Sequence, residues 1–302
     1  MDRAQLSTEL SNPASKDLDL LSSTAAVSLM QSQDRGVHAA VELARAEITA
    51  AVDLIASRWR AGGRLFYLGA GTSGRLAMLD AVECPPTFQS PPEMVQALIA
   101  GGPAALTGAV EGAEDDELAA GRELDLRGLT SRDVVFGIAA SGTTPYVRAG
   151  LEHARQRQAA TIFLACVPRE QVSDSADISI RVITGAEVLT GSTRLKAGTA
   201  TKLVLNTITT LAMVRMGKVH GNLMVAVNTS GNAKLVDRGI RLVAELAACD
   251  RETAAKLLAA AQGQVQIAVI MSRRGLAAAD ARECLERSGG SLRAALGDAG
   301  TR

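Results

Sequence analysis

Two short loops rich in glycine and hydroxyl side chains stand out as candidate phosphate sites. Residues 69–74 read Gly-Ala-Gly-Thr-Ser-Gly, and residues 140–145 read Ala-Ser-Gly-Thr-Thr-Pro. Each loop follows an apolar run and precedes an amphipathic stretch, so backbone N–H groups at the start of a helix would meet a ligand there together with the hydroxyls. One such loop commonly only caps a helix, but two of them favour a single small phosphorylated ligand.

The first loop also fits the Gly-x-Gly-x-x-Gly pattern of dinucleotide sites. Such a site needs an acidic side chain at the end of the second strand to bind the ribose, and the apolar run at residues 94–100 ends instead in two glycines. The Gly-Lys-Ser/Thr pattern of an ATP-binding P-loop does not occur in the sequence. Dinucleotide and ATP binding are therefore disfavoured.

Two carboxylates near these loops are candidates for acid–base chemistry. Glu83 is followed at once by Cys-Pro-Pro, which predicts the end of a helix, where a negative charge is unfavourable against the helix dipole. Surroundings that compensate by holding a proton on this carboxyl would suit a general acid. Glu114 is followed by Asp115 and Asp116 at an expected helix N-terminus, where acidic residues are typical caps. Spacing alone does not single out Glu114.

Composition argues against nucleic acid and membranes as partners. The 302 residues contain 32 Lys plus Arg and 32 Asp plus Glu, and 2% are aromatic, which indicates neither a basic surface nor a stacking platform for bases. No apolar stretch approaches the roughly 20 residues of a membrane span, and the acidic N-terminus does not resemble a signal peptide. The four cysteines lack Cys-x-x-Cys pairs and metal-ligand spacing, so we expect a reducing compartment, buried thiols and no structural metal.

Alternating apolar and amphipathic stretches predict the framework that positions the loops. Short apolar runs typical of buried parallel strands occur at residues 65–68, 94–100, 134–139 and 161–165. Helical stretches are expected between them near residues 75–82, 115–124 and 146–158. This alternation predicts a doubly wound α/β fold with a parallel sheet, in which ligands bind at the C-terminal ends of the strands.

Helices are expected on both sides of this α/β region. Apolar residues recur at steps of three and four from Val37 to Trp59, a further helix is expected at residues 196–216, and short amphipathic helices follow beyond residue 240. The expected domains are an N-terminal helical segment (1–60), the α/β domain (61–239) and a small C-terminal helical domain (240–302).

Longer segments resemble the N-acetylmuramic acid 6-phosphate etherase family. They read LGAGTSGRLAMLDAVECPPTF (68–88), AGGPAALTGAVEGAEDD (100–116), GIAASGTTPYV (137–147) and GAEVLTGSTRLKAGTATKLVLNTITT (185–210). The match runs from about Leu6 through Arg238 and implies a sugar isomerase fold that binds a phosphosugar. Residues 185–202 also resemble the signature shared with the glucokinase regulatory protein, so that signature alone does not separate an enzyme from a regulator.

The resemblance implies a carbon–oxygen lyase that removes the D-lactyl ether of N-acetylmuramic acid 6-phosphate in cell-wall amino sugar recycling, leaving N-acetylglucosamine 6-phosphate. By this resemblance Glu83 matches the catalytic acid and Glu114 the base, and the reaction needs no metal or organic cofactor. Ser73, Ser141 and Thr144 would hold the 6-phosphate. Further binding candidates are Gly71, Thr72, Gly142, Thr143, Glu187, Ser192, Arg194 and Lys196.

One departure and two alternatives remain open. Thr143 stands where the family usually has Arg, which removes a positive charge beside the phosphate loop, unless the charge comes from elsewhere. A sugar-phosphate-binding regulator of a sugar kinase would need the phosphate loops but not both carboxylates, and an aldose–ketose isomerase of this fold would release no lactate. The resemblance further implies a cytoplasmic homodimer.

Overall fold

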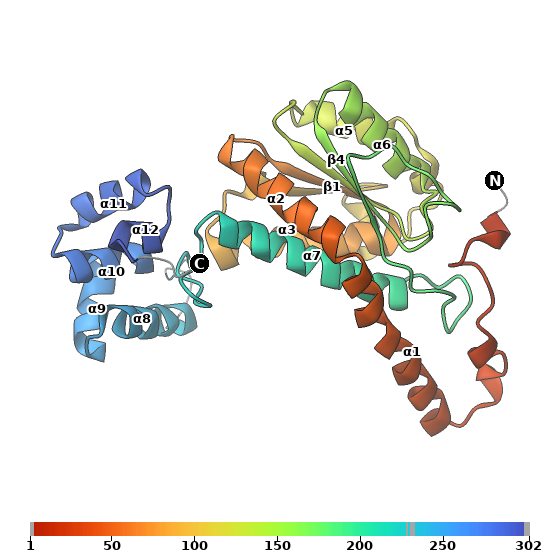
Figure 1. Cartoon of the computed structure of the whole chain (residues 1–302), viewed down its shortest axis with the longest axis horizontal. Helices are drawn as coiled ribbons and strands as arrows, with labels where there is room; N and C mark the ends of the chain where they lie inside the picture. The colour runs from red at the N-terminus through yellow and green to blue at the C-terminus, as the bar shows by residue number, and fades with distance from the viewer. Residues whose placement is uncertain (1–2, 228, 230–232, 299–302) are drawn as a thin grey trace. The chain divides into compact units, whose positions relative to one another are not determined.

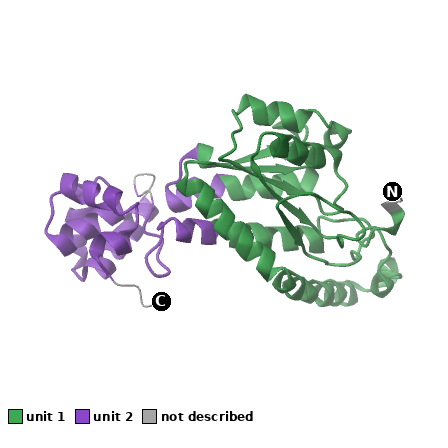
Figure 2. Cartoon of the chain, turned by 45° about the horizontal axis from the view of Figure 1, so that its top comes forward, with its two compact units in different colours: residues 1–81, 93–209 green, residues 82–92, 210–302 purple. Residues whose placement is uncertain are grey.

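The chain forms two compact units in the computed structural model, which describes residues 3–227, 229 and 233–298 (Figure 2). Unit 1 comprises residues 1–81 and 93–209, and unit 2 comprises residues 82–92 and 210–302. This division follows packing, whereas the ranges 1–60, 61–239 and 240–302 follow the type of element. Those three ranges stay a proposal about the domains.

Unit 1 is built on a parallel five-stranded sheet (Figure 1). Its strands are β1 (Leu65–Gly69), β2 (Val95–Ile99), β3 (Val134–Ile138), β4 (Ala160–Ala165) and β5 (Ile178–Arg181). The order β2-β1-β3-β4-β5 confirms the predicted parallel sheet and adds β5, which the sequence analysis missed. Because the winding direction switches between β1 and β3, a crevice for ligands is expected at the C-terminal ends of these two strands.

Helices cover both faces of the sheet, as a doubly wound fold requires (Figure 1). One face carries α5 (Ala119–Leu126) and α6 (Pro145–Gln156), while α3 (Gly71–Phe88) and α7 (Lys196–Arg215) contribute their unit 1 portions to the other. The remaining helices of unit 1 are α1 (Ser23–Leu43), α2 (Arg45–Arg60) and α4 (Ala104–Thr107), with the 3₁₀ helices η1 (Arg3–Gln5), η2 (Pro13–Ser15), η3 (Leu18–Leu20), η4 (Pro92–Met94) and η5 (Ala113–Asp115).

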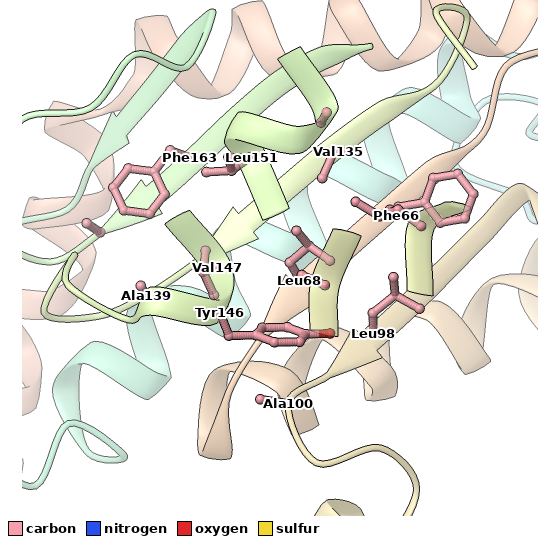
Figure 3. Close-up of a cluster of buried hydrophobic side chains, with 14 of the residues drawn as sticks. Phe66, Leu68, Leu98, Ala100, Val135, Ala139, Tyr146, Val147, Leu151 and Phe163 are labelled. Atoms are coloured by element: carbon pink, nitrogen blue, oxygen red, sulfur yellow. The ribbon is translucent and has the colours of Figure 1, made fainter. Parts of the chain in front are cut away.

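An apolar cluster joins α6 to the sheet (Figure 3). Phe66 and Leu68 of β1 are fully buried there, together with Val147 of α6. Gly150 permits the close approach of the helix, because a Cβ at this position would lie 2.4 Å from Leu68 Cδ1. This packing fixes α6, and therefore the loop of residues 140–145 that leads into it.

The opposite face of β1 holds a buried polar cluster. Since side chains alternate along a strand, Tyr67 points away from Phe66 and Leu68, and its hydroxyl donates to Asp80 Oδ2 of α3 at 2.9 Å. Thr209 of α7 donates to Asp80 Oδ1 at 3.1 Å, and Lys202 Nζ lies 3.9 Å from the same oxygen. Burial raises the pKa of Asp80 despite these partners. The cluster ties α3 and α7 to the sheet within unit 1.

Unit 2 contains a helical bundle with its own apolar core, which includes Val243, Ile267 and Ile270. Its helices are α8 (Ala233–Ala247), α9 (Arg251–Ala260), α10 (Val265–Arg274), α11 (Ala278–Arg287) and α12 (Leu292–Leu296). These confirm a helical C-terminal region. Among the described residues, no helix is both long and apolar enough to cross a membrane.

Three expected helices differ from those observed. Helix α3 continues through Pro85 and Pro86 to Phe88, so the expectation that Glu83 lies at a helix end was wrong. Each proline removes one backbone donor, but the other hydrogen bonds of this helix sustain it. The expected helix at residues 115–124 begins later, because η5 comes first and α5 starts at Ala119. The expected helix at residues 37–59 is two helices that meet at Ala44.

Candidate active site

The two glycine loops lie side by side at the C-terminal ends of β1 and β3. The parallel register places Gly69 of β1 beside Ile138 of β3, and each loop starts immediately after its strand. Both loops contribute to one cavity of about 180 Å³, which we call the hydroxyl cavity. It is lined by Ala70, Gly71, Thr72, Ser73, Glu114, Ala139, Ala140, Ser141, Thr144, Thr193, Gly198 and Thr201.

Glycines are required where these loops turn tightly. Gly71 and Gly142 have φ angles of 51° and 77°, in the left-handed region that side chains with a Cβ rarely adopt. A Cβ on Gly74 would lie 2.5 Å from Ile99 Cγ1, so this glycine lets the start of α3 approach β2. The sequence Gly-Ala-Gly-Thr-Ser-Gly therefore brings the Thr72 and Ser73 hydroxyls to the edge of the sheet.

Helix N-termini supply the positive potential of the hydroxyl cavity. The described residues that line it include neither Lys nor Arg. Helix α3 begins at Gly71, and Gly198 and Thr201 belong to the first two turns of α7. The N-terminal end of a helix carries partial positive charge, which suits an anion such as a phosphate. At α7, however, the backbone N–H groups of Lys196 and Ala197 already donate to the carboxylate of Glu187, so α3 is the better anion site.

A second cavity of about 300 Å³ adjoins the first and shares Glu114, Ser141, Thr144 and Thr193 with it. We call it the carboxylate cavity, because Glu9, Glu114 and Asp115 contribute to its wall. Its other lining residues are Leu6, Ser141, Thr143, Thr144, Pro145 and Thr193. Thr143 Oγ1 lies 3.0 Å from Ser141 Oγ, so the two side chains form a hydroxyl pair.

Glu114 belongs to both cavities and is the acidic residue best placed for chemistry. It lies in η5, which follows Gly112 with its φ angle of 71°. Its neighbour Asp116 instead caps α5, where Oδ1 accepts hydrogen bonds from Leu118 N at 2.9 Å and Ala119 N at 3.0 Å. The structure thus supports the capping role expected for Asp116 and leaves the exposed Glu114 side chain at the cavity wall.

Glu83 lies elsewhere on α3. Its side chain is exposed, and it does not line either cavity. It belongs to unit 2, whereas Ser73 and Glu114 belong to unit 1. Its role as catalytic acid stays a prediction.

The signature after β5 has a structural function at the start of α7. Glu187 is fully buried, and its two carboxylate oxygens accept hydrogen bonds from Lys196 N at 3.0 Å and Ala197 N at 2.9 Å. Lys196 Nζ donates to Gln33 Oε1 at 3.4 Å, and Arg194 is exposed. Neither cavity is lined by Glu187, Ser192, Arg194 or Lys196, so their substrate-binding roles stay predictions.

Sequence reasoning missed three polar residues of the two cavities. Thr193 lies between the binding candidates Ser192 and Arg194, so its position in the signature could have indicated that it lines the site. Thr201 lies one helical turn after Ala197, whose carbonyl accepts its hydroxyl hydrogen bond at 2.8 Å. Glu9 comes from an N-terminal segment that carries no periodic signal.

The positive charge expected near the second loop comes in part from Arg148. This residue of α6 donates from Nη1 to Gly142 O at 3.3 Å and to Ser173 O at 3.1 Å. A guanidinium thus contacts the backbone of the loop although Thr143 carries no charge. Arg148 does not line either cavity, so its effect on a ligand there is through space.

Cys166 follows β4 beside this site and is buried, as expected from the sequence. Burial raises the pKa of its thiol to about 12, and the nearby Glu187 carboxylate acts in the same direction. The thiol therefore stays protonated and unreactive at neutral pH.

Comparisons with known proteins decide the family. Residues 47–155 match the glucokinase regulatory protein N-terminal SIS domain, and residues 113–211 match the SIS domain. The N-acetylmuramic acid 6-phosphate etherase of Parasynechococcus marenigrum is 54% identical over 99% of this chain and 94% of its own length. The protein of the same name from Mycolicibacterium smegmatis is 51% identical over 98% of this chain and 99% of its own.

The chain belongs to the N-acetylmuramic acid 6-phosphate etherase family. The SIS match confirms the sugar isomerase fold expected from the sequence. A solved phosphoheptose isomerase from Francisella tularensis is 16% identical, with a TM-score of 0.48 over 65% of this chain and 98% of that chain, which is too distant to carry an argument. The assignment to the etherase family rests instead on sequence similarity along nearly the whole chain.

Proposed function

We propose that this protein is a lyase that releases D-lactate from N-acetylmuramic acid 6-phosphate and leaves N-acetylglucosamine 6-phosphate. The observation that carries the proposal is the position of Glu114 on the wall of a hydroxyl-lined cavity, at the strand ends where a doubly wound sheet binds ligands. The proposal is supported by relatives named N-acetylmuramic acid 6-phosphate etherase, which match this chain over nearly their whole length.

The 6-phosphate would occupy the hydroxyl cavity. Ser73, Ser141 and Thr144 line this space, and the N-terminus of α3 favours a negative charge in it. The described lining residues include no cationic side chain. This mode of binding does not need one, because backbone N–H groups act as donors.

The chemistry is an elimination followed by addition of water. Glu114 would remove the C2 proton of the open-chain sugar, which the C1 aldehyde acidifies. The C3–O bond then breaks as a C2=C3 double bond forms, and a carboxylic acid protonates the leaving ether oxygen of D-lactate. Water finally adds its hydroxyl to C3 and a proton to C2. Glu83 is the proposed acid by resemblance, and its carboxylate would later activate the water.

A homodimer would explain the position of Glu83. Its exposed carboxylate belongs to unit 2, whereas Ser73 and Glu114, which line the hydroxyl cavity, belong to unit 1. Helix α3 also exposes Leu79 and Val82, three residues apart, with 44% and 54% of their surface accessible. We propose that two copies associate, so that Glu83 of the partner subunit reaches the substrate.

The proposed location is the bacterial cytoplasm, in recycling of cell-wall amino sugars. A phosphorylated sugar is retained inside the cell, and the four cysteines are free thiols, which agrees with a reducing compartment.

The deciding experiment follows lactate release from N-acetylmuramic acid 6-phosphate in D₂O. The expected products are D-lactate and N-acetylglucosamine 6-phosphate with one deuterium at C2, detected by mass spectrometry. Binding of the phosphosugar without release of lactate would favour a regulator of a sugar kinase. Isomerisation of a phosphosugar without lactate release would favour an aldose–ketose isomerase.

A further inference from the structure

The N-terminal strap, residues 6–15, forms one wall of the carboxylate cavity and is held in place at both ends (Figure 1). At its start, Leu6 is 3% exposed within the apolar core of unit 1, and Ser7 N donates to Gln171 Oε1 at 3.0 Å. At its end, Asn12 Nδ2 donates to Ala186 O at 3.1 Å, and Ser15 Oγ donates to Val188 O at 2.7 Å.

Glu9 lies between these anchors, and its half-buried side chain reaches the cavity. It lines the carboxylate cavity with Glu114 and Thr193. Its Oε2 lies close to Gly191: a Cβ at that glycine would be only 3.2 Å from this oxygen, so the absence of a side chain there leaves room for it. The one side-chain hydrogen bond found for this carboxylate is weak, a donation from Thr8 Oγ1 at 3.5 Å, and among the described residues it forms no ion pair.

A half-buried carboxylate with so little compensation has acceptor capacity to spare. Polar groups that leave bulk water normally find hydrogen-bond partners, and an ionised carboxylate accepts up to about four hydrogen bonds. Leu6, Asn12 and Ser15 account for the stability of the strap without Glu9. A purely structural role therefore leaves the side chain of Glu9 unexplained.

The two adjoining cavities differ in charge, and this difference orients a ligand. The hydroxyl cavity has a single acidic lining residue and the N-terminus of α3, whereas the carboxylate cavity has three acidic residues and, among the described lining residues, no Lys or Arg. A phosphate is repelled from the second cavity, and uncharged O–H and N–H donors are favoured there.

We infer that Glu9 accepts hydrogen bonds from the hydroxyl groups of the phosphosugar and thereby helps to select a sugar phosphate over a bare phosphate. This specificity role rests on the proposed function, because it assumes a phosphosugar with its phosphate in the hydroxyl cavity.

The test compares two ligands by isothermal titration calorimetry: N-acetylglucosamine 6-phosphate and inorganic phosphate. The variants are E9A, E9Q and, as a control on the same strap, L10A, whose side chain is 48% exposed. E9A is expected to weaken binding of the sugar phosphate by about ten- to a hundredfold while changing inorganic phosphate affinity less than about twofold. E9Q keeps one acceptor oxygen and should fall between E9A and the wild type, and L10A should match the wild type.

Equal affinity of E9A and wild type for the sugar phosphate would overturn the inference. Loss of both ligands in E9A, or the same loss in L10A, would also overturn it, because either result means that the strap is merely loosened. These failures are distinct from failure of the proposed function, in which the wild-type protein itself releases no lactate. For an active wild type, kcat/KM of E9A should fall mainly through a higher KM.

Discussion

Glu114 offers the most direct test at the scale of a single residue. Because it lines both cavities, replacement by Gln keeps the shape of the wall and removes the base. E114Q should bind N-acetylglucosamine 6-phosphate like the wild type and lose about 10²- to 10⁴-fold in kcat for lactate release. The matched control is E117Q, an exposed carboxylate of the same loop that lines neither cavity. Near-normal turnover by E114Q would assign the base to another group.

Thr143 allows a gain-of-charge experiment at the second loop. Its hydroxyl is 3.0 Å from Ser141, a proposed phosphate ligand, so the longer side chain of T143R can bring a guanidinium near the phosphate. We expect inorganic phosphate to bind about three- to tenfold more tightly, with a steeper salt dependence, measured by calorimetry at two ionic strengths. T143A should show neither change. Unaltered affinity in T143R would mean that the phosphate does not bind beside this loop.

The sequence predicted those site residues whose role depends only on their neighbours along the chain. The loops at residues 69–74 and 140–145 combine turn glycines with hydroxyls at helix starts, and those features are visible without a structure. Glu9 and Thr201 reach the site through tertiary packing, which has no counterpart in nearby sequence. Glu83 was placed at a helix end because prolines usually mark one, and α3 accommodates both of them.

At the scale of an element, the start of helix α7 allows a test of what the signature at residues 185–202 does. Glu187 accepts hydrogen bonds from the backbone N–H groups of Lys196 and Ala197 in a fully buried position. Its loss in E187A leaves two buried donors unpaired, and the free energy of unfolding should fall by about 2–4 kcal/mol, measured by urea denaturation. E187Q retains one acceptor oxygen and should lose less. If E187A is instead as stable as the wild type but does not bind the sugar phosphate, Glu187 is a substrate ligand.

A helix or strand could be predicted where its own residues carry the apolar pattern, and not where its conformation depends on contacts with other elements. Buried strands β1, β3 and β4 have continuous apolar runs, which the sequence analysis recognised. The edge strand β5 has four residues, three of them only partly buried, and it depends on pairing with β4 for its conformation. Helix α1 begins at Ser23, well before the periodic apolar positions, because Ser22 caps it by accepting a hydrogen bond from Ala25 N.

At the scale of the whole molecule, the α/β fold followed from the alternation of strands and helices, but the packing units did not. The sequence predicts a domain at residues 61–239 from the type of its elements, and that range stays a prediction. The packing units divide the chain on a different basis, and unit 2 includes residues 82–92 together with residues from 210 onward. Contacts between segments distant in sequence decide such a division, and local sequence patterns do not encode them. Association between copies, on which the proposed role of Glu83 depends, likewise rests on contacts that local patterns do not encode.

A mixing experiment tests the proposed homodimer through its active sites. If each site takes Glu114 from one subunit and Glu83 from the other, E83A and E114A homodimers are both inactive. A mixed dimer then contains one site with both carboxylates intact and one site with neither. After equimolar mixing and subunit exchange, half of the dimers are mixed and half of their sites are functional, so about a quarter of wild-type activity should return. The control is the double variant E83A/E114A mixed with either single variant, which should restore nothing. A dimer in analytical ultracentrifugation without recovery of activity would mean that both carboxylates act within one subunit.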